Sequence, residues 1–290
     1  MFRSLGRVLM TGTTGFIGSH LSKRLIKEGF EVHCLQRSEA DLNDPTQVSK
    51  VFESVQPQFL VHLASKAEPS RNLSEFPDYY ENSVRPAMNL ALCAPVDLKL
   101  AVFVGSCEEY GDGSVPFQES QRPEAFSPYG WAKVSTLYGV ELIARQRKLS
   151  WTWLRPFLTF GPGQKSKALI PSLIHSLSAG QSVPLTGGEQ TRDFLFIDDL
   201  CGMFVQILLQ PEKASGKIFN LCSGIPRKIR DVASLVQKFV GKGSLEFGVI
   251  PYREREAMNF YGSNSRFKES FGAVSLTDFE RALALTVGKK

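Results

Sequence analysis

The chain has few of the features that mark membrane, secreted or metal-binding proteins. No apolar run approaches the roughly 18 residues that a membrane helix needs, and the first one, Val8 to Met10, leads directly into a glycine motif and leaves no room for a signal peptide. The five cysteines are widely spaced and include no Cys-x-x-Cys pair or Cys/His cluster. We therefore expect no metal, no membrane partner and a reducing, cytoplasmic setting.

Long blocks of one charge are also missing. Lysine and arginine together number 34 against 29 acidic residues, but no basic block alternates with aromatic residues, so we expect no nucleic-acid partner. The mild positive charge of +5 suits a small anionic substrate such as a phosphate ester. With 42% hydrophobic residues in 290, the chain has the composition of a globular protein with one core, or one core and a lobe.

What the sequence does contain is a regular alternation of apolar runs and helical periods. Strands are predicted at 8–10, 32–35, 59–63, 100–104 and 151–154, with helices at 16–26, 48–55, about 78–93 and about 127–146 between them. This rhythm is typical of a parallel α/β sheet. Beyond Leu154, proline and glycine become frequent and the predicted elements become short, at 169–178, 193–196, 198–209 and 217–221. A second region therefore begins there, without a flexible linker.

A glycine motif follows the first predicted strand. The letters TGTTGFIG, Thr11 to Gly18, space three glycines as G-x-x-G-x-x-G and open the first predicted helix. Glycine permits a tight turn and lets the backbone approach a pyrophosphate closely, while the amides at the helix N-terminus face the anion. An ordinary glycine-rich turn could carry the same letters, but the position after strand one favours a dinucleotide site.

The end of the second predicted strand bears on which cofactor is bound. An acidic side chain there binds the ribose diol of NAD, whereas a basic one favours the 2′-phosphate of NADP. The chain has LQRS, Leu35 to Ser38, and Arg37 could pair with a phosphate through its planar guanidinium. We expect NADP(H) over NAD(H). Arg37 as a solvated loop charge, or a rescue of NAD binding by Glu39, are the alternatives.

The letters YGWAK place Tyr129 and Lys133 four residues apart, on one face of a helix whose start is signalled by Ser127 and Pro128. An ammonium one turn from a phenol stabilises the phenolate, so we expect a lowered tyrosine pKa and proton exchange with a carbonyl or alcohol. A Tyr-x-x-x-Lys pair is common by chance, and its meaning depends on its surroundings.

Those surroundings are informative. The segment GSCEEYG, Gly105 to Gly111, follows a predicted strand and puts Ser106 at the strand end, where α/β proteins bind ligands. With these motifs the sequence resembles the extended short-chain dehydrogenase/reductases, the NAD-dependent epimerase/dehydratase family. Further similar segments are HLA (62–64), LRPFLTFGPGQ (154–164), GGEQTRDFLFIDDL (187–200), IFNLCSG (218–224) and YREREAM (252–258), so the resemblance covers nearly the whole chain.

The resemblance implies a fold and an assembly. The fold is α/β, a Rossmann doubly wound parallel sheet with a smaller C-terminal α/β substrate-binding lobe. Residues 1–155 would bind NAD(P), and residues 156–290 would form mainly the substrate lobe, with the chain crossing back to the Rossmann body. The helices from about Asp78 and Ser127 would form a homodimer.

The resemblance also implies roles for individual residues. Tyr129 would be the general acid or base, Lys133 would bind the nicotinamide ribose and tune Tyr129, and Ser106 would hydrogen-bond the reacting oxygen. Cofactor contacts are expected from Gly12, Gly15, Phe16, Ile17, Gly18, Arg37, Asp41, Leu42, Leu63, Ala64, Ser65, Tyr129, Lys133 and Pro156. Substrate contacts are expected from Ser106, Glu108, Tyr129, Leu158, Arg192 and Arg253. For the two arginines, surface ion pairs are the other interpretation.

Three departures from the family pattern narrow the function. Leu158 and Phe160 stand where many relatives have a substrate-binding asparagine and a tyrosine, so sugar recognition is expected to differ. Cys107 stands where dehydratases of hexose nucleotides often carry an aspartate that they use as an acid. This difference weakens a dehydratase interpretation. Glu108 matches a proton-abstracting glutamate of dehydratases, but we favour a substrate-binding role. The short step from strand two to Asp41 is similar to that of the NADPH-using reductases.

Together, these expectations predict an enzyme that uses NADPH to reduce the 4-keto group of a nucleotide diphosphate 4-keto-6-deoxyhexose. Tyr129 would supply the proton. One rival is an epimerase or dehydratase that keeps NAD tightly bound and returns the hydride to the sugar. A rival of another class is a non-catalytic sensor that binds NADP(H), against which the intact Ser106, Tyr129 and Lys133 speak.

Overall fold

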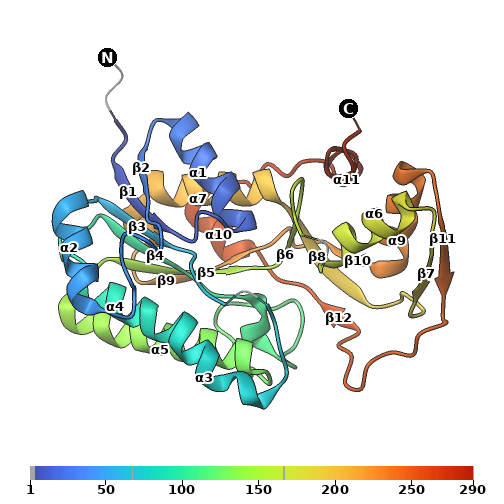
Figure 1. The fold of residues 1–290 in the computed structure, drawn as a ribbon, viewed down its shortest axis with the longest axis horizontal. Coiled ribbons are helices and arrows are strands. Elements are labelled where there is room, and N and C mark those ends of the chain that lie inside the picture. The colour runs from blue at the N-terminus through green and yellow to red at the C-terminus, as the bar shows by residue number, and fades with distance from the viewer. Residues whose placement is uncertain (1–3, 67, 166, 290) are drawn as a thin grey trace.

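A six-stranded parallel sheet with helices on both faces forms the body of the protein (Figure 1). The computed structural model describes residues 4–66, 68–165 and 167–289. The strands are β1 (Arg7–Thr11), β2 (Glu31–Cys34), β3 (Phe59–His62), β4 (Leu100–Val104), β5 (Trp151–Pro156) and β9 (Lys217–Leu221), in the order β2-β1-β3-β4-β5-β9. The predicted Rossmann α/β fold is confirmed. Strand β9 returns from late in the chain to pair with β5.

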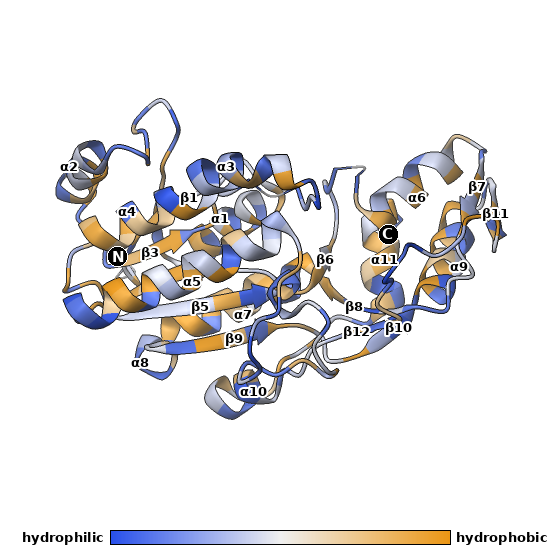
Figure 2. Cartoon of the chain, turned by 90° about the horizontal axis from the view of Figure 1, so that it is seen from below, coloured by the Kyte–Doolittle hydropathy of each residue, from blue (hydrophilic) through white to orange (hydrophobic). Residues whose placement is uncertain are grey.

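The central strands β1, β3 and β4 are largely apolar because both faces of the sheet are covered. In β1, Val8 and Met10 pack into one core and Leu9 into another, on the opposite face. Helices α1 (Phe16–Glu28), α7 (Ile197–Leu209) and α10 (Ser265–Phe271) cover the first face, and α2 (Pro45–Val55), α4 (Arg85–Cys93) and α5 (Pro128–Arg147) the second. Figure 2 shows the apolar residues concentrated along these strands and on the helices packed against them. In the described part of the chain, no helix is long and apolar enough to span a bilayer.

Two of the helix starts shape the ligand side of the sheet. Helix α5 begins as predicted, since the Ser127 hydroxyl accepts the Gly130 amide at 3.0 Å and Pro128 occupies the first turn. Helix α1 begins after Gly15, which has no side chain to cap the first amides. Those amides therefore remain available to an anion at the helix N-terminus.

The helix predicted at about 78–93 starts earlier and is irregular. A 3-10 turn (Leu73–Glu75), α3 (Phe76–Tyr79) and a π turn (Tyr80–Val84) precede α4. Pro86 has no amide hydrogen for the carbonyl four residues before it, so the regular ladder is interrupted at this point. Helical periodicity does not predict such a change of spacing.

The lobe lies beyond β5, to the right in Figure 1. Its small sheet combines β6 (Leu158–Phe160), β8 (Thr191–Phe196), β10 (Pro226–Lys228) and β12 (Asn259–Phe260), and β7 (Ser182–Leu185) pairs with β11 (Ser244–Phe247). Its helices are α6 (Leu169–Ser178), α9 (Ile229–Val240) and α11 (Phe279–Val287), and the short α8 (Pro211–Ala214) follows α7. The buried Asp193 accepts the amides of Ser223 and Gly224, both at 2.9 Å, and so ties β8 to the turn after β9.

Candidate active site

The glycine turn between β1 and α1 is as tight as the motif predicts. Gly12 has a φ of 73°, and a Cβ there would lie 2.6 Å from the Ala64 nitrogen at the end of β3. A Cβ at Gly18 would lie 2.1 Å from the Gly12 carbonyl oxygen. Side chains at these positions would force α1 and β3 away from the turn, so the glycines keep all three segments together.

A cleft of about 730 Å³ opens beside this turn, over the carboxyl ends of β1, β2 and β3. Eight of the predicted cofactor residues line it: Gly12, Gly15, Arg37, Asp41, Leu42, Leu63, Ala64 and Ser65. Its size and the glycine cradle fit the dinucleotide that the motif predicts. No motif marks Glu81, Asn82 and Pro86, which line the cleft from the π turn and the start of α4.

Four predicted cofactor residues are not part of the cleft lining. Phe16 and Ile17 pack against the core on the α1 face of the sheet, and Gly18 lies next to the Gly12 carbonyl. Pro156 is buried at the end of β5, paired with Leu221 of β9.

The loop after β2 bears on cofactor choice. Arg37 lines the cleft. The Glu39 carboxylate accepts the Gln36 amide at 2.7 Å and pairs with His33 Nε2 at 3.0 Å. Both oxygens of Glu39 are thus held by neighbours on β2 and its loop, whereas Arg37 lines the cleft.

Lys133 bridges the ends of two strands beneath the cleft. Its buried Nζ donates to the Val104 carbonyl at 3.0 Å and to the Ser65 hydroxyl at 3.1 Å, and lies 5.8 Å from the centre of the Tyr129 ring. Burial lowers the pKa of Lys133 to about 8, with the charge of Glu109 acting in the opposite sense. The ammonium is therefore close to its titration range near neutral pH.

The predicted lowering of the Tyr129 pKa is wrong. Burial raises this pKa, and the nearby Cys107, Glu108 and Glu109 raise it further, while a hydrogen bond with Ser106 acts against them. Desolvation of the phenolate thus outweighs the stabilisation that we expected from Lys133. The phenol remains protonated at neutral pH.

Ser106 lies at the carboxyl end of β4, where a 3-10 turn, Cys107–Tyr110, begins. Its hydroxyl oxygen accepts the Glu108 amide at 3.2 Å, and its own amide donates to the Glu109 carboxylate at 2.8 Å. The hydroxyl hydrogen is left for the Tyr129 oxygen or for a substrate oxygen. The structure thus brings Ser106 and Tyr129 together as the motifs predict.

Charged side chains of opposite sign meet around Glu108. Burial raises the pKa of Glu108, while the guanidiniums of Arg71 and Arg192 lower it. Sequence reasoning missed Arg71, which lies in the loop after β3 and carries no motif. Arg192 donates to the Ala257 carbonyl at 2.8 Å and pairs with Glu256. The YREREAM segment therefore lies beside Arg192.

The remaining predicted substrate residues are more open. Arg253 is exposed, three residues before Glu256. Leu158 lies on β6 with 40% of its surface exposed. Neither is placed against Tyr129 by a recorded contact.

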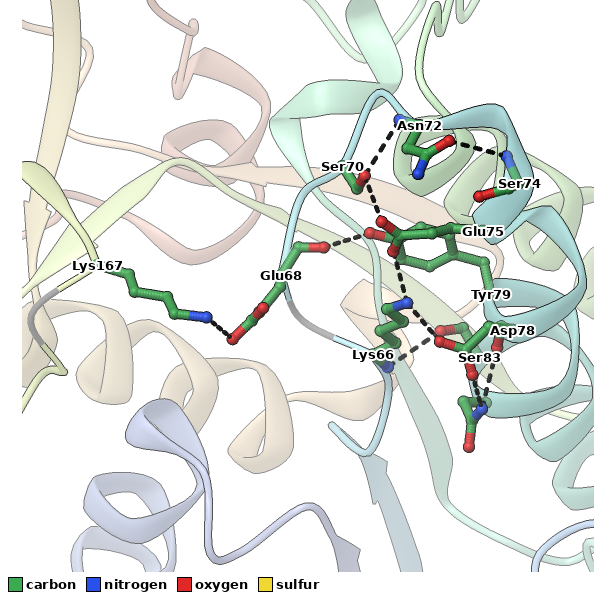
Figure 3. A network of polar contacts seen from close by, with 11 residues as sticks. Lys66, Glu68, Ser70, Asn72, Ser74, Glu75, Asp78, Tyr79, Ser83 and Lys167 are labelled. Carbon is green, nitrogen blue, oxygen red and sulfur yellow. Dashed lines mark hydrogen bonds and ion pairs between the residues drawn. The ribbon is translucent and has the colours of Figure 1, made fainter.

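The loop after β3 is held by a network of ion pairs (Figure 3). Lys66 pairs with Glu75 at 2.6 Å and with Asp78, and Lys167 of the lobe reaches Glu68 at 2.6 Å. The last pair joins loops 99 residues apart, which no local pattern predicts. Exposed pairs of this kind contribute little to stability, but they help to set the path of the loop that carries Arg71.

Comparison with known proteins agrees with this geometry. Residues 8–222 match the model of the NAD dependent epimerase/dehydratase family. The chain belongs to this family. It is an NAD(P)-dependent enzyme of the extended short-chain dehydrogenase/reductase type, whose relatives are nucleotide-sugar epimerases, reductases and dehydratases.

Individual family members are similar over nearly their full length. A probable UDP-glucuronate 4-epimerase of Rhizobium meliloti is 25% identical, over 97% of this chain and 94% of its own. A GDP-6-deoxy-D-mannose reductase of Pseudomonas aeruginosa is 26% identical, over 92% and 91%. A UDP-glucose 4-epimerase of Thermotoga maritima, crystallised with UDP-glucose, superposes with a TM-score of 0.88 at 25% identity, covering 97% of both chains.

The site of this family member offers acid–base and hydrogen-bonding chemistry. A protonated phenol, a hydroxyl and an ammonium converge at the strand ends, next to a cleft built for a dinucleotide. Among the described residues, no cluster of three or more His, Cys, Asp or Glu side chains could hold a metal.

Proposed function

We propose that the protein catalyses NADPH-dependent reduction of the 4-keto group of a nucleotide diphosphate 4-keto-6-deoxyhexose. The observation that carries this proposal is the convergence of Ser106, Tyr129 and Lys133 at the strand ends, beside a cleft that Arg37 lines. A phenol placed beside a hydroxyl and an ammonium can give its proton to a carbonyl oxygen as charge develops there.

In this mechanism each residue has one task. Ser106 and Tyr129 hold the ketone oxygen by hydrogen bonds, and Tyr129 gives its proton to that oxygen as charge develops on it. Lys133 keeps its ammonium beneath the ring and, through Ser65, borders the cleft. The bound cofactor supplies the hydride; the chain supplies position and charge.

Arg37 supports NADPH as the cofactor. Its guanidinium lines the cleft, whereas Glu39, the acidic residue that would favour the ribose diol of NAD, is held by His33 and the Gln36 amide. A guanidinium is a strong partner for a 2′-phosphate and a poor one for a diol.

The substrate is proposed to be a nucleotide-diphosphate sugar held mainly by the lobe. Residues 1–155 bind the cofactor in this proposal, and residues 156–290 contribute Arg192 and Arg253 for the phosphates and Leu158 for the sugar. Glu108 binds the sugar by hydrogen bonding, consistent with its position between two guanidiniums. A reductase acting on such a sugar, GDP-6-deoxy-D-mannose reductase, is among the relatives.

We also propose a homodimer that uses the outer face of α4 and α5. The two helices pack side by side, and Leu92, Tyr138 and Leu142 leave large apolar surfaces exposed on them. Exposed apolar residues grouped on neighbouring helices are typical of a protein–protein interface.

The proposal is tested by following NADPH oxidation at 340 nm with a panel of nucleotide 4-keto-6-deoxysugars. We expect net oxidation that prefers NADPH, and a loss of at least about 10² in kcat for Tyr129→Phe. Tyr138→Phe, an exposed tyrosine on the same helix, is the matched control and should keep full turnover.

Other results would point to the rivals. Conversion of a nucleotide sugar without net oxidation, with NAD found in the purified protein, would identify an epimerase or dehydratase. Absence of any turnover in the wild type, with NADPH still bound, would identify a sensor.

A further inference from the structure

We propose that Glu109 is a positioning residue for Ser106, so that the reaction depends on a carboxylate that never touches the substrate. This inference rests on the proposed function, because it assigns Ser106 to the reacting oxygen. Nothing in the motif itself distinguishes Glu109 from its neighbour Glu108.

The carboxylate is fully enclosed and each oxygen has a defined partner. Glu109 is 0% exposed. Its Oε1 accepts the Ser106 amide at 2.8 Å and the Trp153 indole Nε1 at 2.9 Å, and its Oε2 accepts Arg155 Nε at 2.7 Å. One side of the carboxylate thus holds the amide of Ser106, and the other is fixed by an arginine that is 1% exposed.

Space for this arrangement is made by Gly105. A Cβ at this glycine would lie 2.0 Å from Glu109 Oε1 and 2.2 Å from the Trp153 indole nitrogen. The Glu109 carboxylate therefore occupies the space that a side chain at position 105 would need. Any larger residue at 105 would displace it.

The arginine is anchored in turn by the sheet. Arg155 lies on β5 and donates to the Tyr110 hydroxyl at 3.0 Å, and that hydroxyl donates to Asn220 Oδ1 on β9 at 2.6 Å. Two neighbouring strands of the parallel sheet thereby define where Glu109 sits. A network in which every member is satisfied is rigid, and small displacements within it are costly.

Stability alone does not account for the buried pair. Removing two charges from water is costly, and well-packed apolar residues of similar volume fold as well or better. What apolar residues would not supply is an acceptor for the Ser106 amide. With its amide held by Glu109 and its Oγ accepting the Glu108 amide, Ser106 has its backbone and its hydroxyl oxygen both fixed beside Tyr129.

A double-mutant cycle separates positioning from stability. Glu109→Gln has one acceptor oxygen for donors on two sides, so either orientation of the amide sets N–H against N–H. We expect kcat to fall by about 10² with KM changed less than threefold, as misplacement of a reacting group by about an ångström does. The kcat of Ser106→Ala should fall by a similar factor, and the kcat of the double variant should be no lower than that of Ser106→Ala alone.

Glu119→Gln is the matched control. Glu119 is also buried, accepts the backbone amide of Asn220 at 2.8 Å and lies near Arg266. The same Glu-to-Gln change is thus made at the other end of the network, away from Ser106. It should lower the melting temperature and leave kcat within about twofold. If Glu109→Gln does not fold, Glu109→Leu with Arg155→Met leaves no unpaired buried charge and takes its place. An equal loss of kcat in the Ser106→Ala and wild-type backgrounds would overturn the proposal.

Amide exchange tests the same contact without an assay. In uniformly ¹⁵N-labelled protein we expect the Ser106 amide to exchange slowly in the wild type and in Glu119→Gln, and at least about tenfold faster in Glu109→Gln. Equal exchange in all three proteins would contradict the role of Glu109. If the wild type reduces no ketosugar, the proposed function fails while this measurement still decides the contact.

Discussion

Lys133 sets a pH limit on the reaction. Burial lowers its pKa from 10.5 to about 8, so above that pH the folded protein loses an ammonium that an exposed lysine would keep. We expect kcat/KM for the reduction to be constant to about pH 7 and to fall about tenfold per unit above pH 8. Steady-state kinetics from pH 6 to 10 would measure this, and an undiminished rate at pH 10 would contradict it.

The same shift of the Lys133 pKa does not itself destabilise the fold at high pH. Between pH 8 and 10.5 the folded chain binds fewer protons at Lys133 than the unfolded chain, so this residue's contribution to stability rises with pH in that window. If activity falls between pH 8 and 10.5, the melting temperature should therefore show no destabilisation caused by Lys133.

Arg37 is expected to decide the choice of cofactor. Arg37→Ala removes the guanidinium at the cleft, and we expect the KM for NADPH to rise by about 10- to 100-fold, since a charge-assisted bidentate contact is worth about 1.5–3 kcal/mol. The KM for NADH should change less than threefold. Arg24→Ala, on α1 with Glu28 as partner, should alter neither. Equal effects on both cofactors would count against a 2′-phosphate contact.

At this scale the sequence identified residues that motifs mark and missed those that only the fold brings together. Ser106, Tyr129 and Lys133 converge because each follows a strand end or a helix start with a clear signal. Glu109 and Arg155 carry no such signal, since their pairing requires β4 and β5 to be neighbours. The pKa of Tyr129 was misjudged for the same reason: burial is a property of the assembled site.

Among the elements, α1 depends closely on the absence of a side chain at Gly18. Gly18→Ala would place a Cβ 2.1 Å from the Gly12 carbonyl, so α1 must shift away from the turn that forms the cleft. We expect a melting temperature lower by several degrees and a Kd for NADPH raised at least tenfold, measured by calorimetry.

A second helical glycine provides the control. Gly202 of α7 has open space around its Cα, so Gly202→Ala should leave binding unchanged and add up to about 1 kcal/mol of stability through helix propensity. If both substitutions behave alike, tight packing at Gly18 is not what positions α1.

Except for α10, the elements of the Rossmann body were predictable because each strand carries its own apolar run and each long helix its own period. The strands β6, β7, β10, β11 and β12 were not, as they have two to four residues and are partly polar. Their pairing depends on partners such as β8 that are distant in the chain. The break in the helical segment at Tyr80–Val84 was likewise invisible to periodicity.

For the whole molecule, the dimer is the main expectation. Leu142→Glu places a charge on the outer face of α5, where 46% of the leucine is exposed, and we expect a shift from dimer to monomer in sedimentation velocity. Val249→Glu, at an apolar residue of the lobe that is 61% exposed, should leave the sedimentation coefficient unchanged. A wild type that sediments as a monomer would exclude this interface.

Because β9 comes late in the chain, the Rossmann sheet can be completed only after part of the lobe has been synthesised. Because β9 flanks β5, the outer edge of β5 stays open during synthesis until residue 221 has left the ribosome. The Asn220 amide group, which completes the buried network through Tyr110, arrives with the same strand. The nascent chain therefore acquires its finished Ser106 turn only after β6, α6, β7 and β8 of the lobe have been translated, and an incomplete chain ending before β9 should be inactive however much cofactor it is given.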